Sequence, residues 1–302
     1  MAQETRVAYG ERLAELIKEN ENIIVLDADL TKSTKTIEAK KACPERHFNA
    51  GIAEANMMGM AAGLAASGKT VFASSFAMFA SGRAWEIIRN SICYPNLNVK
   101  VCATHAGLSV GEDGASHQAC EDVAIMRALP NMKIFVPCDQ YETKAVIDYV
   151  SKIDGPCYVR MGRGKVDDVY NENTVFNFDK VDVLREGNGD VVLFAMGLMV
   201  QEALKAAEEL DATVVNVSSI KPCDEEDIRK LLACHKRAYT LEEHSIIGGL
   251  FSLVAEIKAK TDITTPVTPI GVNDTFGESG KMNDVLKKYG LTADHIKEVV
   301  KG

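Results

Sequence analysis

The stretch Val99-Lys-Val-Cys-Ala-Thr-His-Ala-Gly-Leu-Ser-Val-Gly-Glu-Asp-Gly-Ala-Ser-His-Gln118 joins a short β-branched run to a glycine-rich polar loop. The run Val99–Thr104 predicts a strand, and the loop begins where that strand should end. Two histidines and two acids share the loop. Its three glycines permit backbone shapes that let side chains and amides converge on a small polar ligand. A glycine-rich surface turn is the structural alternative, because histidine and acidic residues are ordinary in loops.

Short β-branched runs alternate with helical patterns on both sides of this stretch. Strands are predicted at Ile23–Leu26, Val71–Ala73, Val99–Thr104, Lys133–Pro137 and Cys157–Arg160. Helices are predicted between them, at Tyr9–Asn20, Glu54–Ala66, Arg83–Ser91, Glu121–Leu129 and Tyr141–Ser151. This alternation predicts a mostly parallel sheet covered by helices on both faces, with ligand sites at the loops that leave the carboxyl ends of the strands.

A polar stretch divides the chain. The periodicity lapses from Gly162 to Asp182, which predicts a first domain over residues 1–164, a linker over 165–182 and a second domain over 183–302. Beyond the linker, strands are predicted at Val191–Ala195, Thr213–Val217 and Ala238–Leu241, and helices at Val200–Leu210, Glu225–Cys234 and Leu250–Lys260. The expected fold class is therefore α/β, with two doubly wound domains of which the second is smaller.

Composition excludes several classes of function. Hydrophobic residues make up 46% of the 302 residues and charged residues 25%, as in an ordinary globular protein. The net charge of −9 disfavours binding to nucleic acid or anionic lipid. The 8 cysteines include no Cys-x-x-Cys pair, and most are expected to be buried. No secretory signal and no apolar stretch long enough to cross a bilayer is seen, so we expect a soluble protein of the reducing cytoplasm.

Glu54 is the one acid in Gly51-Ile-Ala-Glu-Ala-Asn-Met-Met-Gly-Met-Ala-Ala-Gly-Leu-Ala-Ala66, where it precedes a helix of small residues and methionines. Gly59 and Gly63 would let this helix approach another backbone closely, which suits a buried helix pair at a subunit interface. The structural alternative is a first-turn acid that only complements the helix dipole.

Two aromatic residues and an arginine also follow predicted strands. Phe76 and Phe79 lie three apart, after the strand Val71–Ala73. Such a pair usually packs in a core, but one ring can also form a flat apolar wall against a planar heterocycle. The planar guanidinium of Arg163 suits a phosphate, although a solvated arginine explains it equally well. No metal site is expected, because the spacing of the four polar loop residues matches no familiar ligand signature (His105, Glu112, Asp113 and His117).

Taken together and in this order, these segments resemble the C-terminal half of transketolase, which consists of a pyrimidine-binding domain and a C-terminal domain. The resemblance covers essentially the whole chain. It is carried by Gly51-Ile-Ala-Glu54, by Phe76-x-x-Phe79 and, most specifically, by His105 with Gly111-Glu-Asp-Gly-x-x-His117. Thr5-Arg6 and Ala28-Asp-Leu-Thr-Lys-Ser33 are similar to family segments whose Arg and Ser contact the sugar phosphate.

The resemblance implies that thiamine diphosphate is the cofactor. Glu54 would hydrogen-bond the pyrimidine ring nitrogen and promote the imino tautomer, which removes the thiazolium C2 proton. That role needs a carboxylic acid that can be protonated, which burial among the methionines of its helix favours and the helix N-terminus opposes. Phe79 would stack on the pyrimidine, with Phe76 and Asp29 lining the same pocket.

For the substrate, the resemblance implies that Asp113 binds a sugar hydroxyl and that His117 hydrogen-bonds near the reacting carbonyl and assists proton transfer. The phosphate would be held by four further residues, Arg6, Ser33, His105 and Arg163. The implied reaction moves a two-carbon ketol unit from a ketose phosphate to an aldose phosphate, with the anchored phosphate positioning the reacting carbons.

Two departures from the family are visible. Gly82 stands where many members carry a third aromatic residue, which weakens the implied pocket there. Nothing in the 302 residues resembles the Gly-Asp-Gly and downstream Asn that bind magnesium and the diphosphate. We therefore expect a separate N-terminal subunit that holds the magnesium, in a two-plus-two assembly.

Three alternatives remain. The β subunit of a 2-oxo acid dehydrogenase first component has the same two domains and a similar glutamate motif, but the loop from His105 to His117 favours sugar phosphates. A split deoxyxylulose phosphate synthase is disfavoured because that family generally lacks the histidine matching His105. A non-catalytic scaffold subunit is disfavoured by the presence of Glu54, Asp113 and His117. In the second domain, His244 beside Glu242 and Glu243 is expected to cap or brace a helix.

Overall fold

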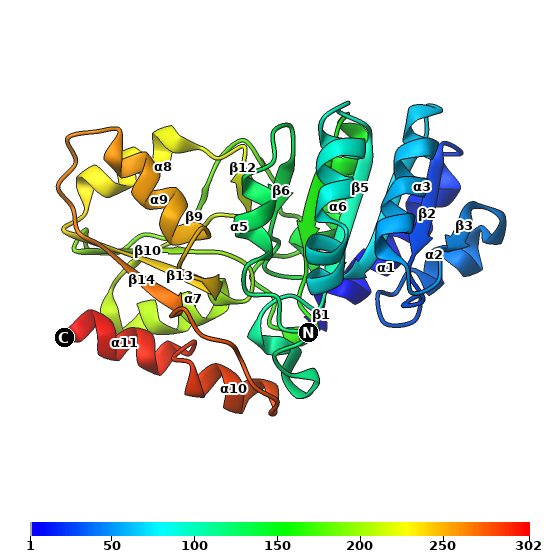
Figure 1. Ribbon diagram of the computed structural model, residues 1–302. Helices are drawn as coiled ribbons and strands as arrows, with labels where there is room; N and C mark the ends of the chain where they lie inside the picture. The colour runs from blue at the N-terminus through cyan, green and yellow to red at the C-terminus, as the bar shows by residue number, and fades with distance from the viewer. Residues whose placement is uncertain (1) are drawn as a thin grey trace.

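The computed structural model describes residues 2–302, which form two α/β units side by side (Figure 1). The first contains a seven-stranded sheet in the order β12-β6-β7-β5-β4-β2-β3. Its strands are β2 (Ile23–Asp27), β3 (His47–Asn49), β4 (Thr70–Phe76), β5 (Val99–Thr104), β6 (Lys133–Phe135), β7 (Cys157–Arg160) and β12 (Ser219–Lys221). All of these pairings are parallel except that of β12 with β6. The five strands predicted for this half of the chain are therefore present, and together they form the expected parallel sheet.

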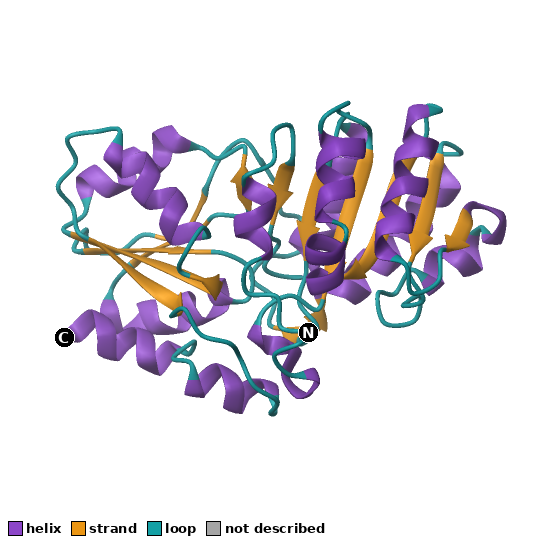
Figure 2. Ribbon diagram, in the orientation of Figure 1, coloured by secondary structure: helices purple, strands orange, loops and turns teal. Residues whose placement is uncertain are grey.

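Helices cover both faces of this sheet (Figure 2). They are α1 (Thr5–Glu19), α2 (Ile37–Ala42), α3 (Glu54–Ala66), α5 (Asp122–Arg127) and α6 (Gln140–Lys152), with a run of π-helical turns and one short α-helix between β4 and β5: η2 (Met78–Arg83), α4 (Trp85–Ile87) and η3 (Ile88–Cys93). Alternate strand residues serve opposite faces, as the two-residue period of a strand requires. Ile23 and Val25 pack with Leu13 of α1, whereas Ile24 and Leu26 pack with Met57 of α3.

The second unit has a five-stranded sheet in the order β14-β13-β10-β11-β9. Its strands are β9 (Asp182–Arg185), β10 (Val191–Ala195), β11 (Thr213–Asn216), β13 (Arg237–Ser245) and β14 (Val267–Val272), and only the β9 pairing is antiparallel. Its helices are α7 (Met199–Leu210), α8 (Glu225–Cys234), α9 (Leu250–Ala259), α10 (Met282–Lys288) and α11 (Ala293–Lys301). The strands and helices predicted between Val191 and Lys260 are confirmed, whereas β9, β14, α10 and α11 were not predicted.

The two units are tied together by backbone pairing. β12 belongs to the second half of the chain but forms the edge of the first sheet, against β6. Within the first unit, a separate two-stranded sheet joins β1 (Gln3–Glu4) to β8 (Lys165–Val166). The 105–118 loop, which follows β5, contacts the second unit through hydrogen bonds of Ser109 with Glu243 and of Gln118 with Glu278.

Two further expectations concern the chain as a whole. Six of the eight cysteines are buried, while Cys223 is half-buried and Cys234 is exposed. Within residues 2–302, no helix combines the length and the apolar character needed to cross a membrane.

Candidate active site

Most of the candidate residues lie at one edge of the seven-stranded sheet. Asp29 follows β2, Phe76 ends β4, His105 follows β5 and Arg163 follows β7. Because these strands are parallel, their carboxyl ends lie at the same edge, where loops converge on ligands in folds of this class. Glu54 is the first residue of α3, which the chain enters after β3.

Glu54 is paired with an arginine that the sequence analysis did not single out. Its carboxylate is 2% exposed, and its Oε2 accepts a hydrogen bond from Nη1 of Arg83 at 2.7 Å. The Arg83 guanidinium lies over the ring of Phe79, 4.8 Å from the centroid, and its side chain is 51% exposed. The carboxyl group is therefore held next to a cation and is not isolated among methionines. The sequence signal for Arg83 is its position four residues after Phe79, in the segment that contains the Phe76-x-x-Phe79 pair.

This arrangement tests whether the site fits a pyrimidine. A guanidinium is a planar hydrogen-bond donor, and here it stacks on Phe79 while donating to Glu54. A planar nitrogen heterocycle needs the same two partners, an aromatic face and a buried carboxyl group at its edge. Gly82 leaves room beside them, since a Cβ there would make only an ordinary contact, 3.4 Å from Cε of Met78. The residues present thus fit the pyrimidine ring of thiamine diphosphate.

The two phenylalanines and two histidines form one cluster. The ring centroids of Phe76 and His105 lie 3.8 Å apart, and those of Phe79 and His117 lie 5.2 Å apart with the rings nearly perpendicular. The centroids of Phe76 and His117 are separated by 6.1 Å. The 105–118 loop therefore folds its second histidine back over the FxxF segment, so the proposed cofactor and substrate residues are neighbours.

His105 is held in an uncommon backbone conformation, with φ at 56°. Only a few per cent of non-glycine residues adopt positive φ, and such residues cluster at functional sites. Its ring is fixed from both sides, by the Thr104 hydroxyl 2.9 Å from Nδ1 and by Nη1 of Arg6 3.3 Å from Nε2. Burial, assisted by the positive charges of Arg6 and Arg163, lowers the pKa of His105 to about 3. The imidazole is therefore neutral at physiological pH.

The expected phosphate residues are distributed around His105. Arg6 is the closest, and its Nη1 also donates to the carbonyl oxygen of Ser33 at 2.9 Å, so the backbone of Ser33 rather than its hydroxyl makes this contact. Arg6 is further paired with Glu4 at 2.9 Å. Arg163 donates to the Val110 carbonyl at 2.7 Å, within the 105–118 loop. Two arginines that are far apart in the sequence thus lie beside the same loop.

Two other expected residues lie toward solvent. Asp113 is exposed at the end of the 3-10 turn η4 (Leu108–Asp113), where a hydroxyl could reach it. Asp29 is exposed and has positive φ of 63°. It exchanges hydrogen bonds with Asn49, whose Oδ1 accepts from the Asp29 amide at 3.0 Å and whose Nδ2 donates to Oδ1 of Asp29 at 3.3 Å. Asn49 ends β3 and precedes Glu54, so Asp29 borders the same edge of the sheet.

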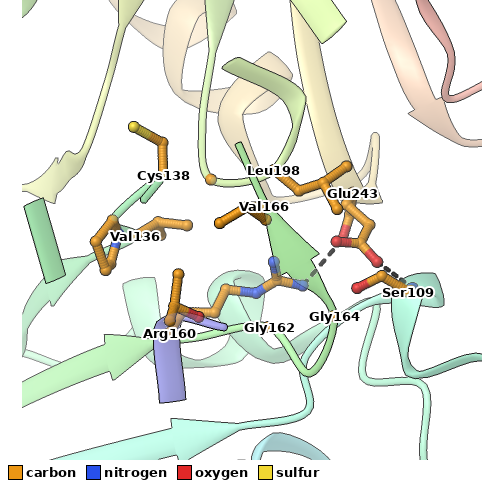
Figure 3. Close-up of a pocket in the computed structure, with 12 residues that line it drawn as sticks. Ser109, Val136, Cys138, Arg160, Gly162, Gly164, Val166, Leu198 and Glu243 are labelled. Carbon is orange, nitrogen blue, oxygen red and sulfur yellow. Dashed lines mark hydrogen bonds between the residues drawn. The ribbon is translucent and has the colours of Figure 1, made fainter. Parts of the chain in front are cut away.

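Neither a metal centre nor a large interior pocket accounts for this cluster. Across residues 2–302, no three His, Cys, Asp or Glu side chains converge in a geometry that would hold a metal ion. The enclosed cavity at the junction of the two units has a volume of only about 20 Å³, enough for a single water molecule (Figure 3). Its wall includes Ser109 of the 105–118 loop together with Arg160 and Glu243.

Comparisons with known proteins identify the family of the chain. Residues 1–168 match the model of the transketolase pyrimidine binding domain, and residues 179–296 match that of the transketolase C-terminal domain. A protein of Methanocaldococcus jannaschii, whose name assigns it to the C-terminal section of transketolase, is 53% identical over 96% of this chain and 93% of its own length. A 6-deoxy-6-sulfo-D-fructose transketolase subunit of Clostridium sp. strain MSTE9 is 39% identical, with 96% and 91% covered. The inactive β4 tetramer of a split-gene transketolase superposes with a TM-score of 0.89 at 49% identity, over 100% of this chain and 98% of that one.

Proposed function

The chain belongs to the transketolase family, with its pyrimidine-binding and C-terminal domains, and from this premise we propose that it is one subunit of a two-part enzyme. The enzyme would use thiamine diphosphate to move a two-carbon ketol unit from a ketose phosphate to an aldose phosphate. The observation that carries this proposal is that the planar guanidinium of Arg83 donates to the buried carboxyl group of Glu54 while it lies over the ring of Phe79.

The chain's own residues would activate the cofactor by hydrogen bonding and stacking. Thiamine diphosphate supplies, when bound, the nucleophilic carbon that carries the two-carbon unit. Glu54 would bond the pyrimidine nitrogen in place of Arg83, and Phe79 would present its ring face to the pyrimidine. Phe76, stacked on His105, would close the side of the pocket toward the sugar. Asp29 would line the edge that its bonds to Asn49 define.

The substrate would be bound at both ends, at its reacting carbonyl and at its phosphate. His117, beside Phe79, is placed to move a proton at the reacting carbonyl, and Asp113 would accept a hydrogen bond from a sugar hydroxyl. At the far end, Arg6 and Arg163 would supply the positive charge for the phosphate. His105 is neutral there, so it would add no charge, and its Nε2, which accepts from Arg6, would orient that arginine toward the phosphate. The Ser33 carbonyl would orient Arg6.

The residues around the anionic group of the substrate would determine which sugar is bound. One relative is a subunit of a transketolase named for 6-deoxy-6-sulfo-D-fructose, a sugar with an anionic group remote from its carbonyl. A pair of arginines accommodates a phosphate or a sulfonate, since both present oxygens to a planar fork. We favour sugar phosphates, because Thr5-Arg6 and the segment Ala28–Ser33 resemble family segments that contact a sugar phosphate.

A partner subunit would complete the site. No segment of the sequence resembles the Gly-Asp-Gly and Asn that hold magnesium and the diphosphate, so an N-terminal subunit would supply them, in a two-plus-two assembly. The β4 tetramer of the split-gene relative is inactive, which is the behaviour expected of such a subunit without its partner. The eight unpaired cysteines suit the reducing cytoplasm as its place of work.

Reconstitution tests the proposal. The purified chain should show no ketol transfer between sugar phosphates, and activity should appear when the N-terminal subunit, thiamine diphosphate and magnesium are added together. Omission of any one component is the control. Full activity of this chain by itself would exclude the two-part enzyme, and inactivity of the complete mixture toward all sugar phosphates would exclude the proposed reaction.

A further inference from the structure

The 105–118 loop is anchored to a buried carboxylate of the second unit. Glu243 lies in β13 and is 4% exposed. Its Oε1 accepts a hydrogen bond from the backbone N–H of Ser109, 134 residues away in the sequence (Figure 3). The carboxylate packs directly against Gly107, where a Cβ would lie 2.5 Å from Cδ of Glu243. The first turn of the loop is therefore shaped around this side chain.

Arg160 ties the end of the loop to the same strand. Its Nη2 donates to the carbonyl oxygen of Ala119 at 3.1 Å and to the backbone carbonyl of Glu243 at 2.9 Å. Its Nε bonds Oδ2 of Asp122 at 2.9 Å, which neutralises the buried charge. The amide of Gly107 donates to Ala119 at 2.9 Å and closes the loop on itself. Both ends of the loop thus meet at Glu243.

The middle of the loop rests on a second segment of the same unit. Nε2 of Gln118 donates to the carbonyl oxygens of Leu108, at 3.2 Å, and of Glu278, at 3.0 Å. A Cβ at Gly111 would lie 3.0 Å from the carbonyl oxygen of Gly280. The turn that carries Asp113 and His117 is therefore supported from behind by residues 278–280.

We propose that Glu243 is a positioning residue for the transfer reaction, through which the second unit holds the 105–118 loop and so sets where Asp113 and His117 meet the sugar. This inference rests on the proposed function and gives the C-terminal domain a role in it. Glu243 touches no proposed cofactor residue, so it would act on the sugar through the loop, by way of Asp113 and His117. The neighbouring Glu242 supplies the contrast, because its carboxylate is equally buried but accepts from the amides of Leu250 and Phe251 at the start of α9.

The test compares Glu243→Ala, Glu243→Gln and Glu242→Ala in the complex with the N-terminal subunit, thiamine diphosphate and magnesium. Loss of one buried hydrogen bond predicts that Glu243→Ala raises KM for the sugar phosphate about tenfold and leaves the Kd of the cofactor unchanged. Glu243→Gln keeps an acceptor oxygen, so its KM should stay within about threefold of wild type. Glu242→Ala should lower the melting temperature at unchanged KM. An unchanged KM in Glu243→Ala, or an equal rise in Glu242→Ala, overturns the proposal.

Hydrogen–deuterium exchange of the chain provides a readout that does not depend on activity. Amide exchange over residues 107–118 should accelerate in Glu243→Ala and stay as in wild type in Glu242→Ala. If Glu243→Ala does not fold, Glu243→Asp keeps the charge beside Arg160 but shortens the reach to the Ser109 amide, and it should show the same two effects. An inactive wild-type complex would refute the proposed function, whereas unaltered loop exchange would refute the role of Glu243.

Discussion

The side chains of Glu54, Arg83 and Phe79 form the pocket that we propose for the cofactor. Glu54 is buried at the first turn of α3, and a buried carboxyl group needs a hydrogen-bonding partner. Arg83 provides it, but half of the arginine side chain is exposed, so the pair contributes at most about 1 kcal/mol. A ligand that satisfies the carboxyl group can therefore displace Arg83 at little cost.

Removal of Glu54 should separate catalysis from folding. In Glu54→Ala we expect turnover by the complete enzyme to fall by at least about a hundredfold, because the group proposed to bond the pyrimidine nitrogen is lost. The melting temperature should change little, since Arg83 is free to turn into solvent. Steady-state kinetics and thermal melts measure the two effects. A variant that turns over at the wild-type rate would remove Glu54 from the mechanism.

Removal of Arg83 should strengthen cofactor binding. Arg83→Met takes away the competitor for Glu54 while keeping an apolar stem over Phe79, so we expect the cofactor Kd to fall by up to about fivefold. The matched control is Arg89→Met, which removes an exposed arginine in the following helical turns that bonds Asn90 and should leave the Kd unchanged. Calorimetric titration of the assembled enzyme measures both. Weaker cofactor binding in Arg83→Met would show that Arg83 assists the cofactor rather than competing with it.

At the scale of single elements, a residue that caps a helix can also hydrogen-bond residues outside that helix. Asp139 caps α6 through Oδ1, which accepts from the amide of Glu142 at 2.8 Å. Its Oδ2 accepts from the amides of Val169 and Tyr170, at 2.8 and 2.7 Å. One buried carboxylate therefore caps the helix and also fixes the segment that leads into the second unit.

Because of this double role, we expect the loss of the Asp139 cap to lower the free energy of unfolding more than the loss of the Asp224 cap. Asp139→Ala should lower the free energy of unfolding by about 3 kcal/mol, because it removes a cap and leaves buried amides unpaired. Asp224→Ala removes the cap of α8, where the side chain accepts from the Asp227 amide, and an ion pair with the half-exposed Lys180, and should cost about 1 kcal/mol. Urea unfolding monitored by circular dichroism measures both variants. Equal costs would show that the contacts of Asp139 beyond the helix contribute nothing.

At the scale of the whole molecule, the two units meet through buried polar groups as well as through β12. Glu142 of α6 is fully buried, and it accepts hydrogen bonds from the Cys138 amide at 2.7 Å and from Nδ2 of Asn216, in β11, at 2.8 Å. Burial raises the pKa of Glu142 to about 7. Glu243 lies at the same junction, and burial raises its pKa to about 7 as well.

These two carboxyl groups predict that stability falls as pH rises. Their folded-state pKa exceeds the ordinary value of 4.5, so the folded protein holds more protons than the unfolded chain between about pH 4.5 and 7. Below about pH 4.5, each group makes its full contribution to the free energy of unfolding. This contribution is lost as pH rises through 7, and the loss is at most about 3 kcal/mol per group. Glu142→Gln does not titrate, so its melting temperature should decline less than that of wild type between pH 5 and 8. Parallel declines would show that Glu142 is not one of the responsible groups.

Local sequence predicted most elements but not all of them. The predicted strand Val99–Thr104 and helix Glu54–Ala66 match the structure, because strand and helix periods are properties of neighbouring residues. β14 was missed because Pro269 and Gly271 are unfavourable inside strands. They are tolerated there since β14 is an edge strand of its sheet. The edge position of β14 follows from the sheet order, which local pattern does not contain.

By itself, the sequence determined the α/β alternation and the order of the motifs that mark the transketolase family, since both are patterns along the chain. The tertiary structure decided which groups meet. It paired Glu54 with Arg83, 29 residues on, and Ser109 with Glu243, 134 residues on. It also placed β12 in the sheet of the other unit. Such contacts depend on how whole elements pack, because a buried charge or amide takes the partner that packing brings within reach, however distant that partner is in the sequence.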